Sequence, residues 1–371
     1  MHVTSLTVTD FRNIAFAVIE PDPTGTTVIT GRNGSGKTSL LEAVGYLATL
    51  QSFRGSPRDA MVRTGAESAI ARAACVVEGR TIDIEAELSR SGRSRTLVNR
   101  QSVRRRADLH DSLRVTVFSP EDIAVVRAGP GERRRFLDDT LAVVEPRTVS
   151  LGEELEKILR QRAALLRQSS GRPSPEIEAT LEVWDARLVA AGTPLVEARE
   201  ALTHQLTPLV AEHYTRLADR EVCVGLGYRR SWDGALGEAL GAARREDLAR
   251  GVTSVGPHRD ELELTLSGLA CRAHASQGEQ RSLALALRLS AHQLATERLG
   301  TSPVLLLDDV FSELDPFRSR ALLAGLPPGQ ALLTTAVPPP EEMAATVTYA
   351  VESDGRVGHV DHVPFPGPGG R

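Results

Sequence analysis

The sequence predicts an α/β protein in which a helical insert divides one mixed domain. Strand and helix patterns alternate from residue 26 to residue 50 and return after residue 252. Between about residues 131 and 250, apolar side chains recur at helical spacing. We therefore expect residues 1–130 and 251–371 to form one discontinuous domain, with residues 131–250 inserted into it as a helical arm.

The composition is that of an ordinary globular protein. The chain has 371 residues, of which 41% are hydrophobic and 25% charged, so it can bury a sizeable core. No apolar run reaches membrane-spanning length and no apolar signal segment follows Met1, so we expect a cytoplasmic protein. The cysteines, Cys75, Cys223 and Cys271, lack metal-binding spacing and are expected to be reduced and buried. A net charge of −4 leaves nucleic-acid binding open, because a local basic patch can do the binding.

Hydropathy patterns predict the elements around the insert. Residues 2–30 are expected to form two strands joined by a turn at the Pro- and Gly-containing residues 21–25. Residues 69–99 alternate between apolar and polar side chains, which predicts an antiparallel β subdomain. The long helix of the insert is expected to be interrupted or kinked at Pro194 and Pro208. The end of the chain, about residues 362–371, is rich in proline and glycine and is expected to be disordered.

The strand expected at residues 27–30 leads into a glycine-rich loop and then a helix. This stretch matches the pattern G-x-x-x-x-G-K-[ST] in the strand–loop–helix setting that a phosphate-binding loop (P-loop) requires. Its eight residues are Gly31, Arg32, Asn33, Gly34, Ser35, Gly36, Lys37 and Thr38. The glycines let backbone N–H groups curl around phosphates, and the helix directs its positive dipole end at them. The loop therefore predicts nucleotide binding, in which Lys37 reaches the β- and γ-phosphates and the Thr38 hydroxyl ligates Mg²⁺.

An apolar run at residues 303–307 ends in two acids. At the carboxyl end of such a strand, Asp308 is expected to hold the Mg²⁺ of a bound nucleotide, directly or through water. The next carboxylate, Asp309, could orient the attacking water. Strands often end in Asp turns, but a P-loop in the same chain favours the catalytic interpretation. ATP and Mg²⁺ are therefore the expected cofactors.

A polar stretch opens the helix expected from about residue 278 to residue 298. It consists of Ser276, Gln277, Gly278, Glu279 and Gln280. A Ser-x-Gly stretch at a helix start offers a hydroxyl and backbone N–H groups to an anion. The same residues fit a capping box, in which Ser276 is the N-cap and Glu279 follows three residues later. Both interpretations can hold at once.

Together these motifs resemble the ATP-binding-cassette (ABC) ATPases of DNA maintenance, the group that includes the SMC proteins. Within this group the chain is most similar to the RecF family of bacterial recombination mediators. The matching stretches span nearly the whole chain: Asp10–Asn13, Gln51–Arg54, Phe118–Asp122, Arg133–Asp138, Ser254–Asp260 and Leu307–Asp315. The resemblance implies an ABC-type, SMC-head-like P-loop ATPase domain with an antiparallel β subdomain and an inserted helical arm.

In this group, ATP is held between two heads, and the signature of one protomer, here Ser276 to Gln280, completes the ATP site of the other. The segment that crosses the dimer interface (the D-loop) corresponds to Ser312, Glu313, Leu314 and Asp315. The resemblance implies a weak DNA-dependent ATPase that closes on DNA as an ATP-dependent homodimer and is released by slow hydrolysis. It also implies duplex or single-strand–duplex junction DNA, RecR and RecO as partners, and roles in replication, recombinase loading at gaps and SOS induction.

Three positions depart from the pattern of the group. Asp309 stands where most cassette ATPases carry Glu, and its shorter side chain predicts slow hydrolysis. Thr334 and Thr335 stand at the position of the usual switch histidine, which leaves γ-phosphate sensing there open. The loop that normally offers a Gln to Mg²⁺ reads Ser-Pro-Glu-Asp at residues 119–122, and no ligand is assigned in it.

Several basic residues allow two interpretations. By resemblance, Arg12 approaches the nucleotide phosphates, but it could equally be a salt-bridged surface arginine. His258 and Arg259 lie in a Gly-Pro turn that is either a structured loop or part of an interface or nucleotide site. Two arginine runs could neutralise DNA phosphates or form solvated helix faces. They are Arg104, Arg105 and Arg106, and Arg133, Arg134 and Arg135.

Other P-loop proteins fit less of the pattern. A transport-type ABC subunit would carry a switch histidine and a compact coupling insert, and a small-molecule P-loop kinase would not need Ser276 to Gln280. An architectural SMC-type ATPase is the nearest alternative. However, at about 1.5 Å per helical residue, each limb of the insert would span only some tens of ångströms, too short for the long coiled coil of an SMC protein.

Overall fold

The computed structural model describes residues 1–103, 106–109, 112–169, 171, 174–218, 221–337, 343 and 345–360. The chain divides into two compact units. Unit 1 comprises Met1–Asp122, Arg216–Asp219 and Leu285–Arg371, and unit 2 comprises Ile123–Thr215 and Arg220–Ala284. The expected disorder of residues 362–371 concerns a segment outside the described residues.

Unit 1 contains a six-stranded antiparallel sheet in the order β2-β1-β4-β5-β6-β7. Its strands are β1 (His2–Phe11), β2 (Ile14–Ile19), β4 (Ser68–Val77), β5 (Arg80–Ser89), β6 (Arg95–Val98) and β7 (Gln101–Val103). The alternating residues 69–99 form three of these strands. The first thirty residues form three strands in place of the expected two, because Asp10 and Arg12 adopt positive φ angles of 51° and 57° and turn the chain between β1 and β2.

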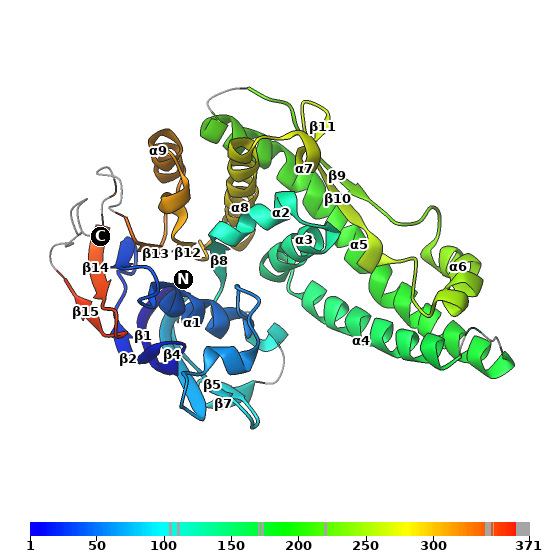
Figure 1. The fold of residues 1–371 in the computed structure, drawn as a ribbon, viewed down its shortest axis with the longest axis horizontal. Coiled ribbons are helices and arrows are strands. Elements are labelled where there is room, and N and C mark those ends of the chain that lie inside the picture. The colour runs from blue at the N-terminus through cyan, green and yellow to red at the C-terminus, as the bar shows by residue number, and fades with distance from the viewer. Residues whose placement is uncertain are drawn as a thin grey trace. The chain divides into compact units, whose positions relative to one another are not determined.

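The second sheet of unit 1 carries the nucleotide motifs, and its order is β15-β14-β3-β13-β12-β8. Its strands are β3 (Thr26–Gly31), β8 (Val115–Phe118), β12 (Val304–Asp308), β13 (Ala331–Thr335), β14 (Ala345–Val351) and β15 (Val357–His359). Neighbours pair in parallel, except that β15 runs antiparallel to β14. Segments from the two ends of the chain, blue and red in Figure 1, therefore lie side by side as β3 and β14. The carboxyl ends of β3, β13 and β12 meet at one edge, where ligands bind in open parallel sheets.

A hydrophobic core joins the two sheets of unit 1 to helix α1 (Lys37–Thr49). The helix buries Leu40, Leu41, Val44 and Leu47 completely, the apolar stripe expected from the sequence. Each such side chain stabilises the fold by about 1.5–3 kcal/mol when fully buried. Because β3 and α1 are both fixed in this core, the P-loop between them is held at both ends. Unit 1 also contains α9 (Pro316–Ala324) and the C-terminal part of α8 (Gln277–Leu299).

Unit 2 is mainly helical. Its helices are α2 (Ala124–Arg127), α3 (Pro130–Val144), α4 (Arg147–Gln168), α5 (Pro175–Ala218, whose last residues belong to unit 1), α6 (Leu236–Arg250), α7 (Cys271–His274) and the start of α8. The 44-residue α5 is not interrupted at Pro194 or Pro208. A three-stranded sheet completes the unit in the order β11-β10-β9, formed by β9 (Val224–Arg229), β10 (Glu261–Leu266) and β11 (Leu269–Ala270). Residues 123–130 and 251–284, expected in the head, cluster here because β10 packs against α3 and α7. The limits of the functional domains stay a prediction.

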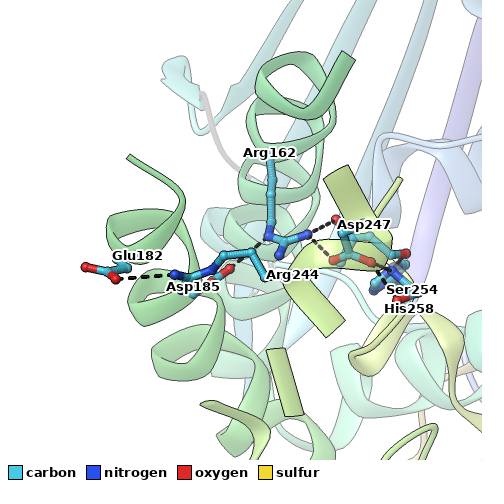
Figure 2. A network of polar contacts seen from close by, with 8 residues as sticks. Arg162, Glu182, Asp185, Arg244, Asp247, Ser254 and His258 are labelled. Atoms are coloured by element: carbon cyan, nitrogen blue, oxygen red, sulfur yellow. Dashed lines mark hydrogen bonds and ion pairs between the residues drawn. The ribbon is translucent and has the colours of Figure 1, made fainter. Parts of the chain in front are cut away.

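A buried polar network fastens three helices of unit 2 (Figure 2). The fully buried Arg162 of α4 donates to Asp185 of α5 at 2.9 Å and to Asp247 of α6 at 2.7 Å. Its guanidinium also donates to the Thr253 hydroxyl at 2.8 Å, and Ser254 donates to Asp247 from the same loop. Helices α4 and α5 run side by side along this contact (Figure 1). The network therefore links α4, α5, α6 and the loop after α6.

Two expectations about composition can be compared with the described residues. Cys75 and Cys271 are buried free thiols, whereas Cys223 is exposed just before β9, so the expectation of three buried thiols was wrong for that residue. Among the described residues, the helices are either too short or too polar to cross a bilayer.

Candidate nucleotide-binding site

The P-loop has a backbone that depends on its glycines. Gly34 and Gly36 have φ angles of 81° and 113°, in the left-handed region that side chains disfavour. A Cβ atom on Gly36 would also lie 2.7 Å from the Asn13 side chain, too close for any other residue without a shift. No side chain caps the start of α1, and its first turn contains no acid. Its N-terminal N–H groups and dipole are therefore available to an anion.

Lys37 folds back onto the loop that precedes it. Its Nζ donates to the carbonyl oxygens of Gly31 at 2.9 Å and of Arg32 at 3.0 Å. Burial lowers the pKa of Lys37, and the nearby carboxylates of Asp309 and Asp308 oppose that shift. The amine thus lies inside the loop, where the motif requires a cation for phosphates.

Asp308 gathers hydroxyl groups from two other elements. The Thr38 hydroxyl of α1 donates to Asp308 Oδ1 at 2.7 Å, and the Thr334 hydroxyl of β13 donates to the same oxygen at 2.6 Å. Burial raises the pKa of Asp308, while these two hydroxyl donors counteract the shift. Thr38 and Asp308 offer the hard oxygen atoms that Mg²⁺ prefers. Beside them, the buried Ser35 hydroxyl lacks a hydrogen-bond partner. This donor set fits a nucleotide with Mg²⁺.

Asp309 is positioned by its backbone as well as by its side chain. Its φ angle of 47° lies in the left-handed region and turns the chain at the end of β12. The Asp309 N–H donates to the Thr334 hydroxyl at 3.0 Å and to the Thr334 carbonyl at 3.1 Å. Its carboxylate accepts from the Ala336 N–H at 3.3 Å. The half-buried acid therefore lies at the sheet edge from which the P-loop also starts, where a water-orienting role is chemically possible.

Asn13 supports the P-loop from the turn between β1 and β2. It lies in the matching stretch Asp10–Asn13, but the sequence assigns it no role at the site. Its amide donates to the carbonyl of Ser35 at 2.7 Å and accepts from the Ser39 hydroxyl at 3.1 Å. Arg12 points into a different cluster, where it forms an ion pair with the fully buried Glu42 at 2.6 Å and donates to the Ala60 carbonyl at 2.8 Å. The structure therefore shows the salt-bridged alternative for Arg12, and its approach to phosphates stays a prediction.

The signature residues belong to unit 2 and form a capping box. The Ser276 N–H donates to the Glu279 carboxylate at 2.8 Å, and the Glu279 N–H donates to the Ser276 hydroxyl at 3.3 Å. Gln280 is buried, accepts from Arg127 at 2.6 Å and donates to the Ala275 carbonyl at 3.1 Å. Ser276 and Gln277 are exposed, so this helix start is open to a ligand or partner.

The expected D-loop follows Asp309 directly in unit 1. The exposed Ser312 donates to the Asp309 carbonyl at 2.8 Å, and Asp315 caps α9 by accepting from the Arg318 N–H at 2.9 Å. Leu314 is half-buried, and the Glu313 side chain lies outside the described set. In the 119–122 loop, Asp122 accepts from the Ser119 N–H at 2.8 Å and pairs with Arg288 at 2.7 Å. That carboxylate therefore has a structural role.

The arginines proposed for DNA differ in their exposure. Arg133 is a correction to the expectation, because it is buried and its guanidinium pairs with Glu261 through two bonds of 2.6 and 2.9 Å. Arg134 donates to the Asp260 carbonyl at 2.6 Å, whereas Arg135 is exposed and pairs with Glu132 on the same helix. Arg104 and Arg105 lie outside the described residues, as does the side chain of Arg106.

The Gly-Pro turn near residue 258 is a structured loop. His258 and Arg259 both contact the Thr253 carbonyl, at 3.1 Å through His258 Nε2 and at 3.2 and 3.1 Å through the guanidinium. The buried Asp260 accepts from the Tyr228 hydroxyl at 2.6 Å. Burial lowers the pKa of His258 to about 4, so the imidazole is neutral at pH 7.

Comparison with known proteins places these features in a family. The family described as "RecF/RecN/SMC N terminal domain" matches residues 2–330. The "DNA replication and repair protein RecF" of Streptomyces avermitilis is 43% identical over 352 residues, which cover 91% of this chain and 93% of that protein. A solved structure of "the recombination mediator protein RecF-ATP in RecFOR pathway" is similar with a TM-score of 0.86 and 27% identity, over 97% of this chain and 99% of that one.

A more distant structure shares the fold. It is an SMC head bound to the C-winged helix domain of ScpA, with a TM-score of 0.57 and 16% identity over 97% of each chain. The fold class expected from the sequence is thus confirmed. The family match over most of the chain and the identity above 40% to a curated relative show that the chain belongs to the RecF family, within the RecF/RecN/SMC group of ABC-type ATPases.

Proposed function

We propose that this chain is an ATP-dependent DNA-binding protein of DNA replication and recombinational repair. Its relative from Streptomyces avermitilis carries the name "DNA replication and repair protein RecF", and a solved relative is described as RecF-ATP. The observation that carries the proposal is the meeting of P-loop and acid strand at one sheet edge, through the 2.7 Å contact between Thr38 and Asp308. This contact supports an ATP site in which some residues bind the phosphates and others ligate the metal ion.

The residues of unit 1 would share the work of ATP binding and hydrolysis. Lys37 would exchange the Gly31 and Arg32 carbonyls for the β- and γ-phosphates, and the uncapped start of α1 would add backbone donors. Thr38 and Asp308 would hold Mg²⁺, which neutralises charge on the transferring phosphate. Asp309 would orient the attacking water. Because its carboxylate is one methylene shorter than the usual Glu and is tied to the Ala336 N–H, we expect slow hydrolysis. The proposed dependence of this ATPase on DNA rests on the resemblance to the RecF family.

The exposed signature supports a second proposal about assembly. Ser276 and Gln277 are exposed at the start of α8, and Ser312 is exposed in the D-loop. These surfaces are available to a second copy of the chain, so ATP binding would close two protomers head to head on DNA, and slow hydrolysis would reopen them. Sequence-independent contacts to phosphates would favour duplex or junction DNA. RecR and RecO are the proposed protein partners, with recombinase loading at gaps and SOS induction as the setting.

The proposed arm is short compared with a coiled-coil SMC limb. Helix α4 has 22 residues and α5 has 44. At 1.5 Å per residue these helices span about 33 and 66 Å. This length supports a mediator with a compact arm over an architectural SMC protein.

The test is to measure DNA binding and self-association with and without ATP. Wild type should gain both properties with ATP, and Lys37→Met should lose the gain because nucleotide binding fails. Ser276→Arg should bind ATP yet fail to self-associate. Ser150→Arg is the matched control, because Ser150 is an exposed serine of α4 outside the proposed site. If ATP changes neither property of the wild type, the clamp proposal is wrong.

A further inference from the structure

The position of the usual switch histidine is occupied by a threonine that contacts the acids of the site. Strand β13 lies between β3 and β12. Thr334 is aligned with Asp308 in the register of β13 and β12, and its side chain is completely buried. Thr334 therefore lies beside Asp308, on the strand between the two strands that carry the nucleotide motifs.

The hydroxyl of Thr334 is hydrogen-bonded to both acids. Its single hydrogen is donated to Asp308 Oδ1 at 2.6 Å, and its oxygen accepts from the Asp309 N–H at 3.0 Å. A buried hydroxyl whose hydrogen is already donated cannot also donate to a phosphate. Thr334 therefore cannot sense a γ-phosphate as a switch histidine does, and acts on the nucleotide only through the two acids.

The turn after β13 continues the same arrangement. The Thr335 hydroxyl donates to the Val337 carbonyl at 2.6 Å and accepts from the Val337 N–H at 3.2 Å. This closed turn presents the Ala336 N–H to Asp309 Oδ1 at 3.3 Å. One strand end thus fixes the carboxylate of Asp308 together with the backbone and carboxylate of Asp309.

Thr334 differs in role from the other hydroxyl on Asp308. Thr38 donates to the same Oδ1 atom, but its hydroxyl is also expected to ligate Mg²⁺. Thr334 is not an expected metal ligand. Both hydroxyls donate to Oδ1, so together they fix the orientation of the carboxylate through one oxygen. Groups that orient metal ligands in this way typically change metal affinity or activity 10–100-fold when removed.

We propose that Thr334 is a positioning residue for ATP hydrolysis, whose hydroxyl holds Asp308 and Asp309 in place of a histidine that contacts the nucleotide. This inference rests on the proposed ATPase function. It predicts that the hydroxyl matters for the Mg²⁺-dependent part of nucleotide binding and for turnover. It also predicts no effect on binding that the P-loop provides without metal.

The test compares Thr334→Val, which keeps the shape and removes the hydroxyl, with Thr334→Ser, which keeps the hydroxyl. A fluorescent ATP analogue is titrated into each protein in Mg²⁺ and in EDTA, and ATP turnover is measured separately. In EDTA, the affinity of Thr334→Val for the analogue should match that of wild type to within about 2-fold. With Mg²⁺, the gain in affinity or the rate of ATP turnover should be about 10–100-fold smaller than in wild type. Thr334→Ser should stay within about 3-fold of wild type in both. Thr96→Val is the matched control, because Thr96 is a buried strand threonine of unit 1 outside the site.

The outcomes separate this inference from the function on which it rests. If Thr334→Val keeps both the Mg²⁺ gain and the turnover, the inference is wrong while the ATPase proposal stands. If Thr334→Ser is as impaired as Thr334→Val, the methyl group and packing matter and the hydroxyl role is refuted. A wild type that binds no ATP in either buffer overturns both proposals. If wild type binds ATP but hydrolyses it too slowly to measure, the Mg²⁺ gain in affinity alone decides.

Discussion

Removing Arg162 should destabilise unit 2 far more than removing a neighbouring surface arginine. Arg162→Met keeps most of the apolar stem but deletes a completely buried guanidinium that bonds Asp185, Asp247 and Thr253. Breaking a buried ion pair by removing one partner costs about 3–5 kcal/mol, because the other charge stays buried. Asp185 keeps Arg244 at 3.0 Å, and Asp247 keeps two bonds from Ser254. These remaining partners favour the lower end, a loss of about 3 kcal/mol in the free energy of unfolding.

Urea unfolding followed by tryptophan fluorescence measures this loss selectively. The chain has two tryptophans, and both Trp184 and Trp232 lie in unit 2. With a denaturant slope of about 2 kcal/mol per molar urea, a loss of 3 kcal/mol lowers the midpoint by about 1.5 M. Arg160→Met is the control on the same helix, because Arg160 is exposed and pairs with Glu156 of that helix at 3.6 Å. Such an exposed pair contributes less than about 0.5 kcal/mol.

Equal urea midpoints for the two variants would contradict this prediction. A shift below about 0.25 M for Arg162→Met would mean that the buried pairs contribute no more than an exposed one. A changed slope instead of a changed midpoint would indicate that the variant alters the unfolding transition itself, and hydrogen exchange of α4 and α6 would then show where the native state opens.

Three further predictions concern the nucleotide site and the pH dependence of the stability of unit 2. Lys37→Met should weaken ATP binding at least about 10-fold through the lost charge-assisted bonds, while the exposed Lys157→Met should not, as measured by nucleotide titration. Asp309→Asn should bind ATP within about 2-fold of wild type but lower single-turnover hydrolysis about 100-fold, and unchanged turnover would exclude the water-orienting role. The folded-state pKa of His258 is lowered to about 4 from 6.5, so the unfolded state binds the extra proton between these values. The urea midpoint of unit 2 should therefore be highest above pH 6.5 and fall as the pH drops towards 4. His258→Gln should flatten that fall between pH 6.5 and 5, above the range where most carboxylates titrate.

Motifs that are contiguous in the sequence could be predicted because their chemistry is local. The P-loop needs its glycines, Lys37 and Thr38 in one stretch, and an apolar strand followed by Asp308 has a similar short-range signal. The turn at Asp10 and Arg12 could not be predicted, because neither residue is the glycine that normally marks a positive φ angle.

Contacts between distant segments gave no comparable signal. Arg133 resembles part of a surface run until Glu261, 128 residues away, is placed beside it. The contact between Arg162 and Asp247, which are 85 residues apart, likewise depends on how distant segments meet. The contact between Thr334 and Asp308 depends on β13 being inserted between β3 and β12, which hydropathy alone does not specify.

The capping box at Ser276 has a consequence for how easily two copies could separate. The carboxylate of Glu279 already occupies the Ser276 N–H, and the Ser276 hydroxyl already accepts from the Glu279 N–H. A phosphate that used the Ser276 N–H would have to displace the Glu279 carboxylate, an anion that belongs to the protein itself. Loss of such a cap costs about 1 kcal/mol, so it would weaken each contact of the proposed dimer at this position by about 5-fold. In the proposed dimer, an internal competitor of this kind would keep the nucleotide-bridged association reversible, because the helix start would regain its own cap when the phosphate leaves.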